Sequence, residues 1–404
     1  MPKSMEVSSW LALVMRHSLE ERPYLLGPVL NLQNCQARLL AARVSTTACI
    51  YRHHANSITG DSEQAGLVGP SDTTFKKLPL ESEIDTKLEE LSNRASTQRK
   101  HIQQECLVLS LRELSDPAFE TKLPFPFVGN ILPKRFKIDS KDGEYNWVYT
   151  GREKFVELLN KLKEVQESPQ NSGFWLYGTR GYGKSHLLAA LVCYLTARKE
   201  RVVYIPDCRE CVKDPVPYIQ AAMLFAWADN DQREKIMLLD TMEMIYRYFQ
   251  NARNVIFIID QLNALASLKA DSPQVKGQKG EVEKWLLRYR TGHKFILSTS
   301  ANYKTYLQTE TTQASELRLH VYGGLTTMEM EYWWKRNADI ILDGDNVRGG
   351  YTKNQVEDQT GCIPLFLNSC VVNGEVNLGV DTLKKVWKQV QSFVSHMKRT
   401  VNIL

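Results

Sequence analysis

A short glycine-rich segment near the middle of the chain constrains the fold more than any other feature. Residues 173–188 have the sequence GFWLYGTRGYGKSHLL, and residues 178–185 within them fit the phosphate-loop pattern G-x-x-x-x-G-K-[ST]. An apolar run precedes this loop, and an apolar run that favours a helix follows it. In this order of strand, loop and helix, backbone N–H groups and the positive end of the helix point at bound phosphate. The segment therefore predicts a phosphate-binding loop.

Most positions of this loop have an expected role in holding a nucleotide. Lys184 is expected to reach the β- and γ-phosphates, and Ser185 to bind Mg²⁺. The other predicted contacts to the nucleotide are Gly178, Thr179, Arg180, Gly181, Tyr182, Gly183 and His186.

The runs of apolar residues predict the fold class. Five β-rich runs are separated by stretches that favour helices: 173–178, 201–206, 254–260, 294–301 and 318–323. Continuous apolar strands that alternate with helices indicate a parallel sheet covered on both faces. We therefore expect an α/β P-loop NTPase with a five-stranded parallel sheet. Because a full strand lies between the loop and the next acidic motif, the expected strand order is 5-1-4-3-2.

That acidic motif is the run VIFIID at residues 255–260, a Walker B pattern. A carboxylate at the end of a buried strand is explained if Asp260 holds Mg²⁺ through water, together with Ser185. The following residue, Gln261, cannot accept a proton but can orient water, so slow hydrolysis is expected. Ser300, at the end of the fourth strand, is expected to face the γ-phosphate, with capping of the next turn as the alternative. The predicted catalytic residues are Lys184, Asp260, Gln261 and Ser300.

Changes in composition and the positions of turn and linker residues predict the domains of the chain. Residues 1–75 are poorly defined, residues 76–120 form a helical arm, residues 121–325 are the NTPase core, and residues 326–404 form a helical lid. The lid is expected to open on the capping box Thr326-x-x-Glu329. Arg318, before the fifth strand, is either a surface residue or an arginine finger.

Bulk composition narrows the class of protein. The chain has 404 residues, of which 43% are hydrophobic and 24% charged, and its net charge is +5. No apolar run approaches the roughly 20 residues of a membrane span, and the N-terminus has no convincing signal peptide. Cys208 and Cys211 have no second Cys/His pair at comparable spacing, so reduced thiols are favoured over zinc. We therefore expect an intracellular protein with no membrane partner.

A further motif precedes the loop, where Gly151, Arg152 and Glu153 open a predicted helix. Together with the loop, Asp260-Gln261 and Gly361-x-x-Pro364, it makes the chain resemble the AAA+/STAND class of NTPases. Within this class, the sequence is similar to that of the Crinkler proteins of oomycetes and fungi and of the related retrotransposon-hot-spot ATPases. The segments that carry this resemblance are 126–137, 147–159, 174–188 and 257–265.

This resemblance implies an ATP-binding module of an effector, with Gly151, Arg152 and Glu153 bordering the adenine. It favours ATP over GTP, and the chain has no Asn/Thr-Lys-x-Asp guanine signature. Residues 1–75 show no translocation header of the Leu-x-Leu-Phe-Leu-Ala-Lys type, so secretion into a host cell rests on the resemblance alone. Three functions stay open: a slow ATPase, a nucleotide-gated module for an unknown protein partner, and a nucleic-acid-associated ATPase. Oligomerisation also stays open.

Overall fold

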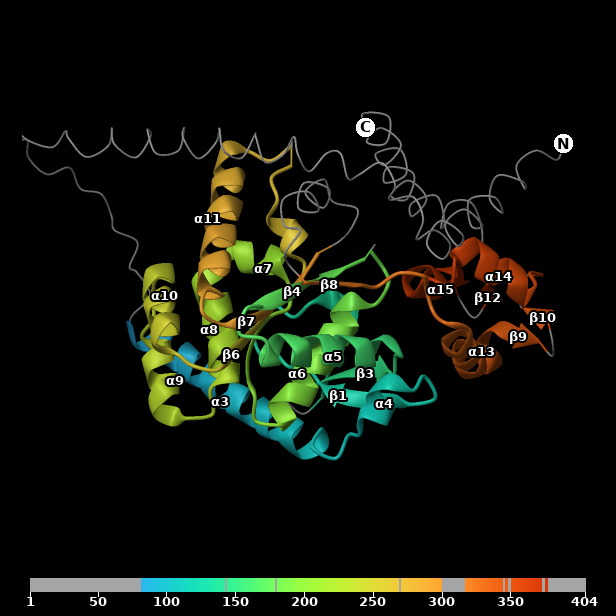
Figure 1. Cartoon of the computed structure of the whole chain (residues 1–404), viewed down its shortest axis with the longest axis horizontal. Coiled ribbons are helices and arrows are strands. Elements are labelled where there is room, and N and C mark those ends of the chain that lie inside the picture. The colour runs from blue at the N-terminus through green and yellow to red at the C-terminus, as the bar shows by residue number, and fades with distance from the viewer. Residues whose placement is uncertain are drawn as a thin grey trace, which may run out of the picture. The chain divides into compact units, whose positions relative to one another are not determined.

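The computed structural model describes residues 81–141, 144–178, 180–268, 270–299, 317–343, 346–347, 350–372 and 375–376 (Figure 1). Several predictions lie outside these residues. They concern the segment 1–75, the loop residue Thr179, the catalytic candidate Ser300 and the end of the predicted lid. The predicted domain boundaries likewise stay predictions.

The described chain begins with a long helix that packs against the rest of the fold. This helix, α3 (Glu81–Glu105), buries Leu91, Ala95 and Ile102 at spacings of one and two helical turns. It contacts the core helices α6 (Lys184–Ala197) and α8 (Pro215–Ala226). Its apolar face therefore belongs to the same hydrophobic cluster as the core.

A small antiparallel sheet follows α3 and the short helix α4 (Leu111–Ser115). Its strand order is β1-β3-β2, with β1 at Glu120–Pro124, β2 at Asp139–Lys141 and β3 at Glu144–Thr150. A 3₁₀ turn, η2 (Lys134–Phe136), lies between β1 and β2. Trp147 of β3 is buried opposite Leu123 of β1. Because β3 ends at Thr150, the Gly151 turn follows directly and connects this small sheet to the core.

The core is a five-stranded parallel sheet, as predicted for the fold class. Its strands are β4 (Gly173–Tyr177), β5 (Arg201–Ile205), β6 (Val255–Ile259), β7 (Lys294–Ser298) and β8 (Leu317–His320). They lie in the order β5-β6-β7-β4-β8, which is 5-1-4-3-2 from the β8 edge when β4 is strand 1. Every residue of β4 and β6 is buried, because helices cover both faces of a parallel sheet. Strand β7 separates β4 from β6, so the loop and Asp260 follow non-adjacent strands.

Helices connect and cover these strands. The remaining elements of this region are α5 (Lys154–Glu167), α7 (Cys208–Lys213), α9 (Asn230–Met237), α10 (Met242–Asn251), η3 (Leu262–Leu265) and α11 (Pro273–Tyr289). The loop helix α6 is apolar on nearly all sides and packs against α3, α5, β1 and β5 (Figure 1). A helix that is hydrophobic all round is stable only when buried, so α6 anchors the loop at its N-terminus.

The C-terminal part forms a second hydrophobic cluster around Trp333 and Trp334. Its elements are α13 (Thr327–Ile341), β9 (Leu342–Asp343), β10 (Asn346–Val347), α14 (Lys353–Thr360), α15 (Pro364–Cys370), β11 (Val371–Val372) and β12 (Glu375–Val376). The capping box predicted at Thr326 and Glu329 is confirmed. Gly361 ends α14 in the left-handed conformation, which a glycine adopts without steric cost.

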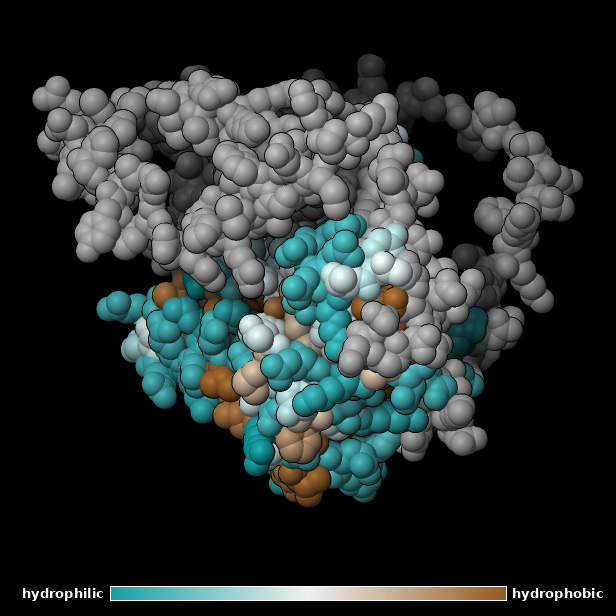
Figure 2. All heavy atoms as spheres, turned by 90° about the vertical axis from the view of Figure 1, so that its right-hand side faces the viewer, coloured by the Kyte–Doolittle hydropathy of each residue, from teal (hydrophilic) through white to brown (hydrophobic). Residues whose placement is uncertain are grey.

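The described residues on the face drawn in Figure 2 form a mixed polar and apolar surface. In Figure 2, hydrophobic residues stand in small groups among hydrophilic ones. Among the described residues, no helix is both long and apolar enough to cross a membrane.

Candidate functional site at the carboxyl ends of the strands

The predicted phosphate loop connects β4 to α6, in the order that the sequence predicts. Gly181 and Gly183 both have positive φ angles, +98° and +87°. Gly178, at the start of the loop, lies against the carbonyl oxygen of Val321, where a Cβ would clash. The loop thus uses glycine at each of these three positions for backbone geometry or for close approach.

Lys184 begins α6 and is almost fully buried, with an exposed fraction of 8%. Its Nζ donates a hydrogen bond to the carbonyl oxygen of Gly178 at 2.6 Å, which folds the side chain back over the loop. Burial lowers the pKa of Lys184 to about 8, and the negative charge of Asp260 partly opposes this shift. The lysine of the loop and Asp260, which follows β6, are therefore close enough for their charges to influence each other.

The residues that follow Lys184 face a group of aromatic rings. The ring of His186 lies 4.8 Å from that of Phe136 and 5.4 Å from that of Trp147, measured between centroids. Burial, with the nearby charges of Arg135 and Arg152, lowers the pKa of His186 to about 4. His186 is therefore a neutral packing residue near pH 7, whereas Arg180, in the middle of the loop, is exposed.

The predicted Gly151-Arg152-Glu153 turn lies beside the loop. The Nη1 of Arg152 donates a hydrogen bond to the carbonyl oxygen of Tyr182 at 3.4 Å, and the Nε of Arg152 pairs with Glu329 of α13 at 2.6 Å. The backbone N–H of Glu153 also donates to Glu329, at 3.3 Å. The turn thus connects the loop to the C-terminal helices, and its contact to an adenine stays a prediction.

The C-terminal cluster touches the loop at a second point. The backbone N–H of Leu365, in the first turn of α15, donates to the carbonyl oxygen of Gly181 at 3.3 Å. The Gly361-x-x-Pro364 segment therefore places the start of α15 against the middle of the loop.

Asp260 directly follows β6 and is buried, with an exposed fraction of 1%. Its Oδ1 accepts a hydrogen bond from the backbone N–H of Gln261 at 2.8 Å. Its Oδ2 pairs with Arg135 at 3.2 Å. The acid predicted from the strand pattern therefore lies at the expected edge, but with a partner that the sequence did not reveal.

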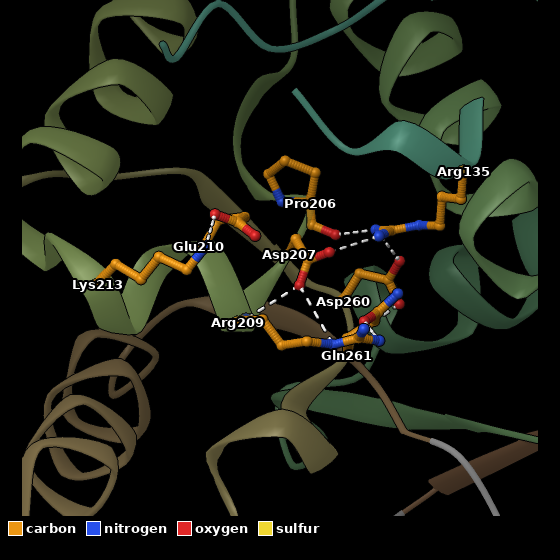
Figure 3. A network of polar contacts seen from close by, with 8 residues as sticks. All are labelled: Arg135, Pro206, Asp207, Arg209, Glu210, Lys213, Asp260 and Gln261. Carbon is orange, nitrogen blue, oxygen red and sulfur yellow. Dashed lines mark hydrogen bonds and ion pairs between the residues drawn. The ribbon is translucent and has the colours of Figure 1, made fainter. Parts of the chain in front are cut away.

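Arg135 connects two strand ends (Figure 3). It comes from η2 and pairs with Asp207, which follows β5, at 2.7 Å. It also donates to the carbonyl oxygen of Pro206. Burial on its own would lower the pKa of Arg135, but Asp260, Tyr204 and Asp207 together raise it, so this guanidinium stays charged.

Gln261 has a left-handed backbone, with φ +59°. Its side-chain oxygen accepts a hydrogen bond from Arg209 (Figure 3). This contact uses one of the two lone pairs of the oxygen with which Gln261 would hold an attacking water. The predicted role of Gln261 in catalysis stays a prediction.

Sequence reasoning missed Asp207, Arg135 and Arg209, and it named Glu329 only as a helix cap and missed its pairing with Arg152. A signal existed for Asp207, because Ile205-Pro206-Asp207 ends an apolar strand much as Ile259-Asp260 does. No local pattern marks Arg135, whose partners lie 72 and 125 residues further along the chain. Arg318, a candidate arginine finger, lies over the ring of Tyr177 at 5.9 Å.

The predicted Mg²⁺ ligands have suitable chemistry but an unsuitable arrangement. A carboxylate and a hydroxyl are the oxygen donors that Mg²⁺ prefers. However, both oxygens of Asp260 already accept protein donors, and one of these donors is the cationic Arg135. The site as it stands does not fit a magnesium ion on Asp260. Within the described part of the chain, no group of three or more His, Cys, Asp or Glu residues could hold a metal ion, and Cys208 and Cys211 are buried free thiols.

Comparison with known proteins corrects the family resemblance. Residues 150–243 match the model of the family described as mitochondrial ribosomal death-associated protein 3. No curated protein matches the chain. The expected resemblance to Crinkler, retrotransposon-hot-spot and STAND proteins is therefore wrong, because the family that matches the loop region is a different one. The matched residues run from the end of β3 to the start of α10, so this chain is similar to that family over the loop and its neighbouring elements.

Proposed function

We propose that the loop at residues 178–185 binds a nucleoside triphosphate and prefers ATP over GTP. The observation that carries this proposal is the buried Lys184, which lies at the N-terminus of α6, directly after a loop with two glycines of positive φ, and close enough to Asp260 for their charges to interact. An ammonium held at a helix N-terminus is a strong partner for phosphate oxygens. The absence of an Asn/Thr-Lys-x-Asp signature supports ATP over GTP.

The comparison supports the same proposal. The matched family is of the P-loop NTPase type, and its match includes the whole of residues 178–185. The mitochondrial and ribosomal setting of that family is not part of this proposal, because the match is confined to elements around the loop.

We infer that hydrolysis at this site is slow. Gln261 has no basic atom that could accept a proton from water, and its side-chain oxygen already accepts a hydrogen bond from the cationic Arg209. Because both oxygens of Asp260 accept protein donors, this proposal places no Mg²⁺ on Asp260. A nucleotide-gated interaction module with negligible turnover is therefore the second candidate, and the lack of a basic atom on Gln261 favours it.

Binding and turnover can be measured separately. We expect Lys184→Ala to lose most ATP affinity in calorimetry, because the only side-chain ammonium predicted for the phosphates is removed. A Lys122→Ala variant, at an exposed position of β1, serves as the charge-matched control and should bind like wild type. Unchanged ATP affinity in Lys184→Ala would refute the site.

Phosphate release by the wild type then separates the two candidates. Measurable release that Lys184→Ala abolishes would support a slow ATPase, and tight binding without release would support the switch. A release rate that DNA or RNA does not change at low salt would count against a nucleic-acid-associated ATPase.

A further inference from the structure

The carboxyl ends of β5 and β6 bring two acids together. These strands are parallel neighbours, with Ile205 paired to Ile259, so the residues that follow them meet at one edge. Asp207 and Asp260 both lie there, with side chains that are 9% and 2% exposed. Two buried carboxylates so close together need a cation between them, because like charges repel strongly where water is scarce.

Arg135 supplies that cation from another part of the fold. Its Nη1 lies 2.7 Å from Asp207 and its Nη2 lies 3.2 Å from Asp260, so one guanidinium spans both acids (Figure 3). The remaining oxygen of each carboxylate accepts a backbone N–H, from Arg209 at 3.0 Å and from Gln261 at 2.8 Å. All four carboxylate oxygens thus have protein donors.

The same guanidinium lies close to the phosphate loop. Phe136, the next residue, packs its ring on His186, which is two residues beyond Lys184. Lys184 in turn interacts electrostatically with Asp260. Arg135 and Lys184 are therefore two cations around one acid, at the edge of the sheet where the proposed nucleotide phosphates would lie.

This arrangement is incompatible with a divalent cation on the same acids. Mg²⁺ demands near-octahedral oxygen ligands and keeps several waters, whereas these oxygens already point at nitrogen donors. A divalent ion would also stand beside a charged guanidinium, which repels it. The side chain of Arg135 keeps 23% of its surface exposed, although its Nε is buried.

We propose that Arg135 is the resident cation of this site, occupying the position between Asp207 and Asp260 that a divalent ion would otherwise take and making nucleotide binding independent of Mg²⁺. Only the second part of this inference, that nucleotide binding is independent of Mg²⁺, rests on the proposed nucleotide site. Arg135 is a positioning residue for the two acids and a second cation for the phosphates. The alternative is a clamp that only ties η2 to the sheet.

The first test measures metal binding without nucleotide. Mn²⁺ is titrated into the protein and followed by electron paramagnetic resonance. We expect the wild type to bind no Mn²⁺ at this site, and Arg135→Gln to gain one Mn²⁺ that a further Asp207→Asn change removes. Arg247→Gln, which removes an exposed arginine of α10, is the control and should resemble wild type. Wild-type Mn²⁺ binding that is lost on Asp260→Asn, or no gain in a folded Arg135→Gln, would overturn the proposal.

The second test measures ATP affinity with excess EDTA and with excess Mg²⁺. We expect the wild-type dissociation constant to change less than about threefold between the two conditions. Arg135→Gln should bind at least about tenfold more weakly in EDTA and recover with Mg²⁺, and Arg135→Lys should restore binding in EDTA. A folded Arg135→Gln that binds ATP like wild type in EDTA would leave Arg135 as a clamp.

The two tests keep this inference separate from the proposed function. If the wild type binds no ATP, or Lys184→Ala binds it unchanged, the nucleotide site is refuted while the Mn²⁺ titration still decides whether Arg135 is the resident cation. Circular dichroism and urea unfolding of each variant show whether it is folded. If Arg135→Gln does not fold, Arg135→Lys carries the test, and Mn²⁺ binding by this folded variant would then contradict the proposal.

Discussion

At the scale of single residues, the loop depends on glycines that no other residue replaces without strain. Gly181 has φ +98°, and a Cβ there would lie 2.6 Å from the Cβ of Leu365. Gly183 has φ +87°, and its Cβ would lie 2.9 Å from a guanidinium nitrogen of Arg152. A side chain at either position would meet both an unfavourable backbone conformation and an occupied space.

We therefore expect Gly181→Ala to lower the free energy of unfolding by about 1–3 kcal/mol, the usual cost of a strained backbone position. ATP affinity should fall with it, because the loop cannot keep its shape. Gly280→Ala in α11 is the matched control, since no atom lies within 4 Å of the added Cβ and φ is not positive there. This control should gain about 0.5–1 kcal/mol. Urea unfolding and calorimetry measure both effects, and wild-type ATP affinity in Gly181→Ala would contradict the loop geometry.

At the scale of elements, the turn before β7 is held by a buried histidine. His293 is 8% exposed, and its Nε2 lies 3.0 Å from the carbonyl oxygen of Phe249, at the end of α10. Burial lowers the pKa of His293, and the hydrogen bond to Phe249 partly opposes this. The ring also packs against Phe257 of β6, so the neutral imidazole connects a helix end to the sheet.

This buried histidine makes stability depend on pH. In the unfolded chain His293 takes up a proton as the pH falls below about 6.5, whereas the folded protein resists this uptake. The unfolded state then binds more protons, so the free energy of unfolding should fall as the pH drops from 7 to 5. His293→Gln keeps a donor for Phe249 and should flatten this slope in urea unfolding. His101→Gln in α3 is the control, and an equal slope in wild type and His293→Gln would contradict the assignment.

At the scale of the whole described molecule, a buried ion pair joins the two hydrophobic clusters. Arg152 precedes the core helix α5, and Glu329 belongs to α13 of the C-terminal cluster. The two lie 2.6 Å apart, with side chains that are 12% and 3% exposed. Glu329 also completes the capping box of α13 and accepts the N–H of Glu153. One carboxylate therefore satisfies donors from both clusters, next to the phosphate loop.

We expect Glu329→Gln to lower the free energy of unfolding by about 3–5 kcal/mol, because it leaves the buried guanidinium of Arg152 without a charge partner. Glu120→Gln is the matched control, since its pair with Arg336 spans 3.7 Å between more exposed side chains. That change should cost at most about 1 kcal/mol. Urea denaturation compares the two, and equal losses would show that the buried pair contributes no more than a surface pair.

Much of the fold could be predicted because its signals are local. Four strands of the parallel sheet are largely apolar runs, whereas β8 alternates apolar and polar residues, and the observed strands end within three residues of the predicted runs. The capping box at Thr326 follows from hydrogen bonds that span only three residues. Residue type and spacing decide such features, so they can be predicted from the sequence alone.

The site was only partly predictable, because its contacts are long-range. The sequence by itself determined the glycine loop, Lys184 at the helix start and Asp260 at a strand end, since each depends on its immediate neighbours. Only the tertiary structure decided that Arg135 lies between Asp207 and Asp260, and that Arg152 meets Glu329 across 177 residues. The physical reason is that the partner of a buried charge is chosen by the packing that excludes water from it. That packing is a property of the assembled elements, and no local pattern in the sequence encodes it.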